Sequence, residues 1–243
     1  HGEHDLAAYE SKLLYYRDRA IVSPTNAAVN EINDLMLASM TGPISVFHSV
    51  DSIVSAEDVD AKQYTPEFLH SVDSGSLPPH ALHVQPGCVL MVLRNYAPHL
   101  GMCNGTRVLC RAGGERTLVV TSLAGVNAGC DVLLPRICCD SGGDADLPFT
   151  LRRYQFPVKL AWAMSINKSQ GQEFPCKLGV YLPRPVFAHG MLYVALSRAI
   201  SFDTVRVLIV EHEDQQGSLA TSDGCQLFTL NVVDAALKFH TVV

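Results

Sequence analysis

Residues 19–36 have the sequence RAIVSPTNAAVNEINDLM, and this stretch decides the fold class. Arg19 to Val22 predict a buried strand, which Pro24 ends because it disfavours helix at the residue before it and lacks an N–H donor. Thr25 or Asn26 can cap the helix that follows. Apolar residues recur there at three- and four-residue steps, namely Val29, Ile32, Leu35 or Met36, and Met40. A strand, a polar turn and an amphipathic helix form the opening unit of an α/β layer.

The same alternation returns near the end of the chain. We predict strands at residues 158–163 and 178–182, a helix at 191–198 and a last buried strand at 205–210. Residues 165–172 form a polar loop that runs into the start of a helix. A short helix at residues 6–16 precedes the first strand, and a helix at 231–239 closes the chain.

The middle of the chain has a different pattern. Residues 45–80 are polar and acidic, and they predict a long connection with one short helix around 66–72. Short strands follow at 89–93, 106–110, 118–121, 131–134 and 153–159, with Asn104-Gly105 as a tight-turn signal. Short strands at this spacing predict a small antiparallel barrel. The fold class is therefore α/β, interrupted by a small β insertion.

Composition excludes several classes of protein. The chain has 243 residues, of which 48% are hydrophobic and 17% charged, so it is expected to bury a sizeable core rather than to form a coiled coil, a collagen or a disordered chain. Its apolar runs, such as residues 88–93, are too short to span a membrane. The sequence opens on His1-Gly2-Glu3, without an initiator Met or a secretory signal, and we expect a piece of a longer protein.

The net charge of −6 hides a segregation of charge along the chain. Residues 51–73 contain six acidic residues and one lysine, a local net of −5, whereas residues 147–184 contain six basic residues and one glutamate, a local net of +5. A chain that is acidic overall can still present one basic face. The net charge therefore does not exclude nucleic acid as a partner.

The cysteines do not predict a metal site. There are eight, at positions 88, 103, 110, 130, 138, 139, 176 and 225, without any Cys-x-x-Cys pair. A zinc site is therefore not expected. Buried free thiols in a reducing compartment are favoured over disulfides.

Two polar runs suggest chemistry. In residues 163–172 (AMSINKSQGQ), hydroxyl, amide and lysine side chains crowd a loop that follows a strand. Such groups suit phosphate oxygens, although a loop satisfied by its own hydrogen bonds is the alternative. In residues 189–198 (HGMLYVALSR), Arg198 falls near a helix end, where an arginine is usually a favourable partner of the helix dipole.

Taken together, short motifs in fixed order resemble a known family. They are Ser23-Pro-Thr-Asn26, Leu77-Pro-Pro-His80, Leu93-Arg-Asn95, Cys103-Asn-Gly-Thr-Arg107, Leu134-Pro-Arg-Ile137, Leu147-Pro-Phe149, Gln155-Phe-Pro157, Ile166-Asn-Lys-Ser-Gln-Gly-Gln172 and Leu192-Tyr-Val-Ala-Leu-Ser-Arg198. From about Arg19 to Val210 the chain resembles the C-terminal half of a Pif-type DNA helicase, and in detail the helicase part of Helitron transposon proteins.

The resemblance implies a specific architecture. The chain is similar to the second RecA-like domain of such helicases, a parallel-sheet domain of the phosphate-loop NTPase type with an inserted small SH3-like β-barrel. On this basis residues 1–104 and 158–243 form the RecA-like domain, and residues 105–157 form the barrel.

The resemblance also implies roles for particular residues. Arg198 matches the arginine that reaches the γ-phosphate from across the domain interface, which makes it the catalytic candidate. The ATP-binding candidates are Gly171, Gln172, Glu173 and Arg198, with Glu173 a departure from the small hydroxyl residue of many Pif-type members. The DNA-binding candidates are Thr25, Asn26, Ser165, Asn167, Lys168, Ser169 and His189. For Thr25 and Asn26, a helix-cap role is weighed evenly against DNA contact.

Five arginines in or beside the barrel have two interpretations. They either follow a DNA strand electrostatically or lie on a solvated surface, and they are Arg94, Arg107, Arg136, Arg152 and Arg153. Trp162 lies in an apolar strand and is expected in the core rather than against a base.

The functional expectation follows from the family and from one missing motif. No Gly-x-x-x-x-Gly-Lys-Ser/Thr phosphate loop occurs in the sequence, and neither does a strand that ends in paired carboxylates. ATP and Mg²⁺ are therefore expected to bind mainly to an upstream RecA-like domain, and this chain alone is not expected to hydrolyse ATP. Single-stranded DNA and that upstream domain are the expected partners, with no membrane.

The leading interpretation is the C-terminal part of an ATP-dependent 5′-to-3′ DNA helicase, nuclear or alternatively mitochondrial, acting in repair, recombination or telomere maintenance. A non-catalytic DNA-binding or interaction module derived from such a helicase is the alternative. An unrelated α/β domain with a barrel insert would need nine ordered coincidences.

Overall fold

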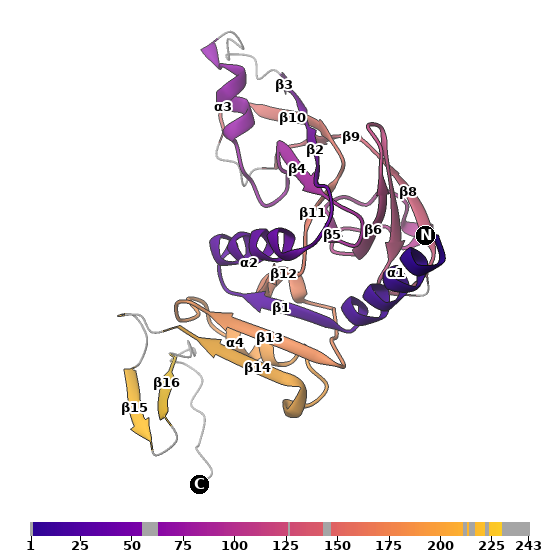
Figure 1. Cartoon of the computed structure of the whole chain (residues 1–243). Coiled ribbons are helices and arrows are strands. Elements are labelled where there is room, and N and C mark those ends of the chain that lie inside the picture. The colour runs from indigo at the N-terminus through magenta and orange to yellow at the C-terminus, as the bar shows by residue number, and fades with distance from the viewer. Residues whose placement is uncertain are drawn as a thin grey trace. The chain divides into compact units, whose positions relative to one another are not determined.

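The computed structural model describes residues 2–54, 63–125, 127–142, 147–210, 213, 217–221 and 224–229 (Figure 1). The chain divides into two compact units. We call residues 15–36 and 162–243 the sheet unit, and residues 1–14 and 37–161 the barrel unit. Among the described residues, no helix is long and apolar enough to cross a membrane.

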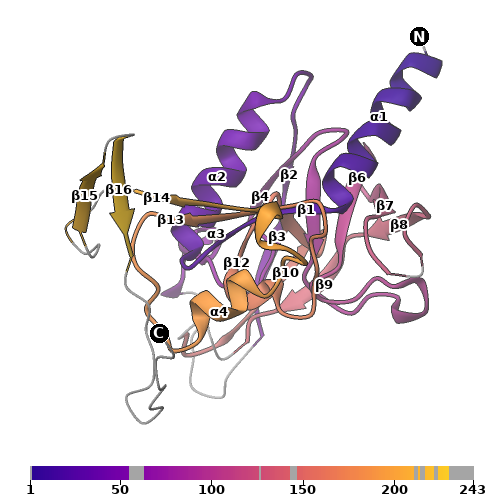
Figure 2. The ribbon, with the colours of Figure 1, turned by 90° about the horizontal axis from the view of Figure 1, so that it is seen from below.

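The sheet unit is built on a parallel sheet with the strand order β12-β1-β13-β14. These strands are β1 (Arg19–Ser23), β12 (Ala163–Ser165), β13 (Lys177–Leu182) and β14 (Val205–Ile209). Helices α2 (Asn26–Ser39) and α4 (Met191–Leu196) lie on opposite faces of this sheet, which Figure 2 views edge-on. The predicted α/β layer is present.

Helix α2 docks through a polar residue in its apolar stripe. Asn33 is 3% exposed, and its side-chain amide donates to the Ala163 carbonyl (3.0 Å) and accepts from the Ala163 N–H (2.8 Å). Because β12 is an edge strand, its N–H and carbonyl groups on the side away from β1 have no neighbouring strand to bond, and Asn33 supplies the partner at Ala163. Val29 is buried on the same helix, whereas Leu35 is 64% exposed, so Met36 rather than Leu35 belongs to the stripe.

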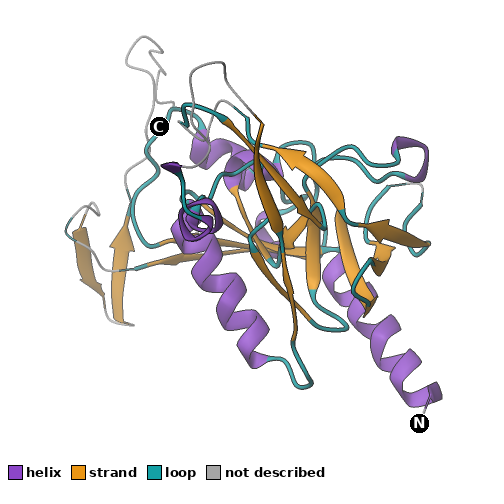
Figure 3. Cartoon of the chain, turned by 90° about the horizontal axis from the view of Figure 1, so that it is seen from above, coloured by secondary structure: helices purple, strands orange, loops and turns teal. Residues whose placement is uncertain are grey.

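The barrel unit is dominated by strands, which are orange in Figure 3. Its largest sheet is antiparallel with the order β11-β5-β6-β7-β8. The strands are β5 (Val89–Val92), β6 (Arg107–Gly113), β7 (Thr117–Ser122), β8 (Asp131–Pro135) and β11 (Val158–Leu160). Gly105 has φ +92°, and the Thr106 N–H donates to the Cys103 carbonyl (3.0 Å), which closes the predicted turn. Because β5 pairs with both β6 and β11, this sheet extends beyond residues 105–157 of the predicted insertion.

The prediction of a long connection at residues 45–80 is wrong. This segment contains β2 (Ser45–His48), β3 (Val50–Val54) and α3 (Pro66–Ser71), of which only the helix was predicted. Strand β2 pairs with β4 (Ala81–Val84), and β3 forms a second sheet with β10 (Thr150–Gln155) and β9 (Ile137–Asp140). The partner of β3 lies about a hundred residues away, so local pattern does not reveal the pairing.

Smaller differences have local causes. The predicted strand at 153–159 is divided by Pro157, since β10 ends at Gln155 and β11 begins at Val158. The predicted buried strand at 205–210 is β14, an edge strand whose Val207 and Leu208 are 49% and 61% exposed. A hairpin of β15 (Gly217–Thr221) and β16 (Gly224–Phe228) follows it. The helix predicted at 231–239 lies outside the described residues.

The thiol prediction is partly confirmed. The seven cysteines whose side chains the structure describes are all free. Only Cys88, Cys110 and Cys139 are buried; Cys103 is half-buried, and Cys130, Cys138 and Cys176 are exposed. Trp162 is 2% exposed and packs edge-on against Tyr16, as expected for a core residue.

Candidate nucleotide and DNA site

Three loops of the sheet unit leave the same edge of the parallel sheet. Ser23 and Ser165 are register partners at the carboxyl ends of β1 and β12, and β13 runs parallel to both. Residues 24–26, 166–173 and 183–190 follow these strand ends. Ligands of open α/β sheets bind outside the carboxyl ends of the strands. The fold therefore places most of the predicted DNA-binding residues at the edge where a ligand is expected.

The loop after β12 is a short 3₁₀ turn, η4 (Ile166–Ser169), rather than the start of an α-helix. Ser169 is fully buried, and its hydroxyl donates to the Ile166 carbonyl (2.7 Å). The Gln172 side-chain amide donates to the Lys168 carbonyl (3.2 Å), and Gly171 has φ +78°. Asn167 is exposed and Lys168 half-buried. The turn thus presents Asn167 and Lys168 outward while Ser169 holds it together.

Arg198 connects the end of α4 to this loop. Its guanidinium donates through Nε to the Val194 carbonyl (3.1 Å) and through Nη1 to the Gln172 carbonyl (3.3 Å). Nη2 donates to the Ser197 hydroxyl (3.0 Å). The Arg198 carbonyl accepts from the backbone N–H of Phe174 (2.9 Å), whose ring is buried. The structure therefore brings together the catalytic candidate and the ATP-binding candidate Gln172.

The other predicted residues lie at the starts of helices or beside Gln172. The Thr25 hydroxyl accepts from the Ala28 N–H (3.4 Å), so Thr25 caps α2, and Asn26 is exposed in its first turn. Glu173 is exposed beside Gln172. His189 is exposed just before Gly190, which has φ +71° and precedes α4.

Ser23 is a polar residue of this edge that was not among the predicted site residues. Its hydroxyl is completely buried beside Ser165 and has no hydrogen-bond partner among the described residues. A buried hydroxyl without a partner is costly, which marks this position as unusual. The signal in the sequence was a serine at the carboxyl end of a buried strand.

Four of the five barrel arginines donate to groups of the fold, and the fifth, Arg107, is buried. Arg153 is 1% exposed and binds Asp51 through Nε (3.0 Å) and Nη2 (2.8 Å). Arg152 binds both oxygens of Asp140 (2.7 Å each), and Arg94 donates to the Asp140 carbonyl (2.5 Å). Arg136 lies over the Phe156 ring, and burial lowers the pKa of Arg107 to about 10. These contacts favour a structural role over a DNA track for the five arginines.

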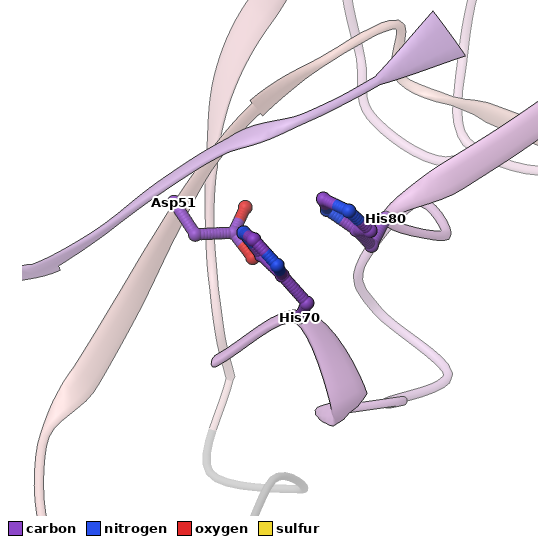
Figure 4. A group of neighbouring side chains, drawn as sticks. All are labelled: Asp51, His70 and His80. Carbon is purple, nitrogen blue, oxygen red and sulfur yellow. The ribbon is translucent and has the colours of Figure 1, made fainter. Parts of the chain in front are cut away.

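A cluster of two histidines, His70 and His80, lies beside Asp51, the acidic partner of the buried ion pair (Figure 4). One possible ligand atom from each of Asp51, His70 and His80 lies within 4.8 Å of the others. The two imidazole rings are stacked, with centroids 3.7 Å apart and planes at 15°. A metal at about 2.1 Å from a nitrogen of both rings would lie far out of each ring plane. Since Arg153 and Ser49 also bind the Asp51 carboxylate, we do not assign a metal to this cluster.

Because His80 lies in this cluster, we expect the free energy of unfolding to fall in mild acid. Burial, and then the neighbouring His70, lower the pKa of His80; Asp51 opposes this shift, and Arg153 and His48 add to it. The unfolded chain therefore binds a proton more readily than the folded chain, so the free energy of unfolding falls as pH drops through about 6.5. We expect the urea midpoint to fall between pH 8 and 5.5, and to fall less in His80→Gln. The matched variant at exposed His99, His99→Gln, should behave as the parent chain does.

Comparison with known proteins agrees with this architecture. Residues 67–111, from α3 into β6, match the family model of the DNA helicase Pif1, 2B domain. Human ATP-dependent DNA helicase PIF1 is 33% identical over 179 residues, which cover 72% of this chain and 25% of the human protein. Saccharomyces cerevisiae (strain YJM789) PIF1 is 55% identical over 56 residues, which cover 23% of this chain and 6% of that protein. The chain therefore resembles the C-terminal part of a Pif-type DNA helicase.

Solved Pif1 structures share the fold. The Pif1 helicase of Candida albicans superposes with a TM-score of 0.58 at 26% identity, over 78% of this chain and 44% of that chain. Bacteroides Pif1 bound to ssDNA has a TM-score of 0.56 at 22% identity, over 78% and 40% of the two chains. The predicted fold class, a RecA-like parallel-sheet domain with a small β insertion, is confirmed. The chain spans about a quarter of the human Pif1 relative, and these matches do not distinguish a Helitron-like subgroup.

Proposed function

We propose that this Pif1-type chain is the part of an ATP-dependent DNA helicase that binds single-stranded DNA and completes the ATP site with Arg198. The observation that carries the proposal is the loop of residues 165–173. It begins at the strand ends that bear the DNA-binding candidates, and it ends at the carbonyl bound by Arg198. One short segment thereby links a DNA-binding edge to a nucleotide-sensing arginine.

ATP and Mg²⁺ would be held mainly by an upstream RecA-like domain, because this sequence contains no phosphate loop. Arg198 would then act across the domain interface. Its present acceptors are neutral carbonyl and hydroxyl oxygens, and hydrogen bonds to a charged phosphate are roughly twice as strong. The guanidinium would exchange the Gln172 carbonyl for the γ-phosphate and stabilise charge that develops during transfer.

That exchange would couple the nucleotide contact of Arg198 to the loop that we propose binds DNA. When Arg198 leaves the Gln172 carbonyl, the loop loses one of the bonds that hold its end. Gln172 also bonds to the Lys168 carbonyl, so the turn that presents Asn167 and Lys168 would shift with it. The DNA contacts we propose are Thr25, Asn26, Ser165, Asn167, Lys168 and His189, and the nucleotide contacts are Gly171, Gln172 and Glu173. Ser169, predicted with the DNA-binding residues, is buried and instead holds the turn that presents Asn167 and Lys168. Stepping is 5′ to 3′, and the protein acts in the nucleus or mitochondrion.

Salt dependence of DNA binding tests the proposal on the chain itself. We expect fluorescence anisotropy with labelled oligothymidylate to show binding that weakens as salt rises. Lys168→Ala should weaken binding and reduce the slope of log K against log salt by about 0.7, the value for one phosphate contact on a single strand. Lys177→Ala removes an exposed lysine at the amino end of β13 and serves as the control.

The outcomes separate the two candidate functions. An unchanged slope in Lys168→Ala removes this residue from the phosphate contacts. Binding that persists in a longer protein that lacks ATP hydrolysis would favour a non-catalytic DNA-binding module. Absence of binding by the purified, folded chain would contradict the DNA-binding role.

A further inference from the structure

Cys88 and Cys110 face each other across two neighbouring antiparallel strands. Val89 and Leu109 are register partners in β5 and β6, which makes Cys88 and Cys110 the next opposed pair. The Cys110 N–H donates to the Cys88 carbonyl (2.9 Å), and the Gly87 N–H donates to the Cys110 carbonyl (2.7 Å). Opposed residues of an antiparallel pair have Cα atoms about 4.5–5.5 Å apart, within the range that a disulfide spans.

The two thiols also contact each other. Both residues are fully buried in the sheet, and their side chains are hydrogen-bonded to one another. Burial raises the pKa of the Cys88 thiol, whereas the bond from Cys88 lowers the pKa of Cys110. Whichever of the two thiols ionises therefore has the other beside it as the second thiol of an exchange.

We propose that Cys88 and Cys110 are a redox pair that closes to an intramolecular disulfide and ties β5 covalently to β6. The remaining buried cysteine, Cys139, lies in β9 of a different sheet, and Cys130, Cys138 and Cys176 are exposed. Of the described cysteines, Cys88 and Cys110 are the two that the strand pairing brings into direct opposition.

The oxidant is a small-molecule disulfide, and the exchange balances in two steps. The thiolate of one cysteine attacks one sulfur of the disulfide, forms a mixed disulfide and releases one thiolate. The other cysteine then loses its proton, attacks the protein sulfur of the mixed disulfide and releases the second thiolate. Two protein thiols are oxidised and one small disulfide is reduced to two thiols. Because both sulfurs are buried, the rate follows local opening of β5 near exposed Pro86.

Closure of this bond restrains the chain between the two strands. The covalent loop runs from residue 88 to residue 110 and contains the turn at Asn104-Gly105. A disulfide that closes a loop of this size removes conformational freedom from the unfolded chain. Oxidation should therefore make the barrel unit harder to unfold without changing the sheet unit.

The test combines peptide mapping with thermal unfolding. The folded chain is incubated with oxidised glutathione, free thiols are blocked with N-ethylmaleimide, and peptides are identified by mass spectrometry. We expect a Cys88–Cys110 cross-link as the main product and a rise of roughly 5–15 °C in Tm that dithiothreitol reverses. Cys88→Ala and Cys110→Ala should abolish both effects, and Cys139→Ala, the matched buried control, should retain both.

Two results would overturn the proposal. One is exhaustive oxidation of the folded parent chain that modifies only the exposed thiols. The other is a Cys88–Cys110 cross-link that forms in urea but not under native conditions. Both are measured on the parent chain, so they remain decisive if a substitution prevents folding.

Discussion

Replacing Arg198 by alanine is expected to lower DNA-stimulated ATP hydrolysis by about 10³–10⁵-fold in a protein that joins this chain to a phosphate-loop domain. The physical reason is that a fixed guanidinium stabilises charge that develops on the transferred phosphoryl group, and alanine supplies no donor. Arg198→Lys should recover little of the rate, because an ammonium lacks the planar, bidentate geometry. The measurement is steady-state ATPase with and without single-stranded DNA.

A structural explanation must be separated from a catalytic one, because Arg198 also binds the Val194 and Gln172 carbonyls. Arg206→Ala is the matched control, since Arg206 lies in the same unit and donates to the Asp203 and Val205 carbonyls. We expect Arg198→Ala to retain DNA affinity and Tm close to those of Arg206→Ala. Wild-type ATPase in Arg198→Ala would remove the arginine-finger role, and a collapse of Tm would reassign the residue to folding.

The second large effect is expected at Arg153. Its guanidinium and the Asp51 carboxylate are each 1% exposed, and it also donates to the Leu69, Val72 and Pro78 carbonyls. Arg153→Ala leaves the buried Asp51 carboxylate without its cation and removes one donor from each of three backbone carbonyls. We expect the free energy of unfolding to fall by about 3–5 kcal/mol, measured by urea denaturation.

The neighbouring arginine provides the control. Arg152 makes the same two-bond contact with Asp140 from the same strand, but both side chains are 43% exposed. Arg152→Ala should therefore change stability little. An Asp51→Leu, Arg153→Met double variant should be more stable than Arg153→Ala, because it removes both charges together. If Arg152→Ala and Arg153→Ala lower the free energy of unfolding equally, burial does not explain the effect expected at Arg153.

Much of the sheet unit was predictable because its signals are local. Pro24 after a short apolar strand, a capping Thr25 and an apolar stripe through Val29 predicted β1 and α2. Each of these features depends on residues within one or two turns of the chain. The polar loop at 165–172 and the helix before Arg198 were also found, although the loop folds into a 3₁₀ turn.

The candidate site was predictable as a set of residues but not as an arrangement. The family motifs indicated Lys168, Gln172 and Arg198, yet only the structure shows that the Arg198 guanidinium binds the Gln172 carbonyl. Burial of Ser169 and the isolated hydroxyl of Ser23 likewise depend on neighbours from other strands. No spacing along the chain encodes these contacts.

The sequence by itself determined the resemblance to Pif-type helicases, the α/β alternation and the local net charges of −5 and +5. Only the tertiary structure decided which of these charged residues pair with one another. Register pairs Asp51 of the acidic segment with Arg153 of the basic segment, and burial converts the two into one structural ion pair. For this pair, segregation along the chain is not segregation in space, because strand pairing joins residues about a hundred positions apart. Lys168 of the basic stretch lies half-buried in the turn after β12, where we propose a DNA contact.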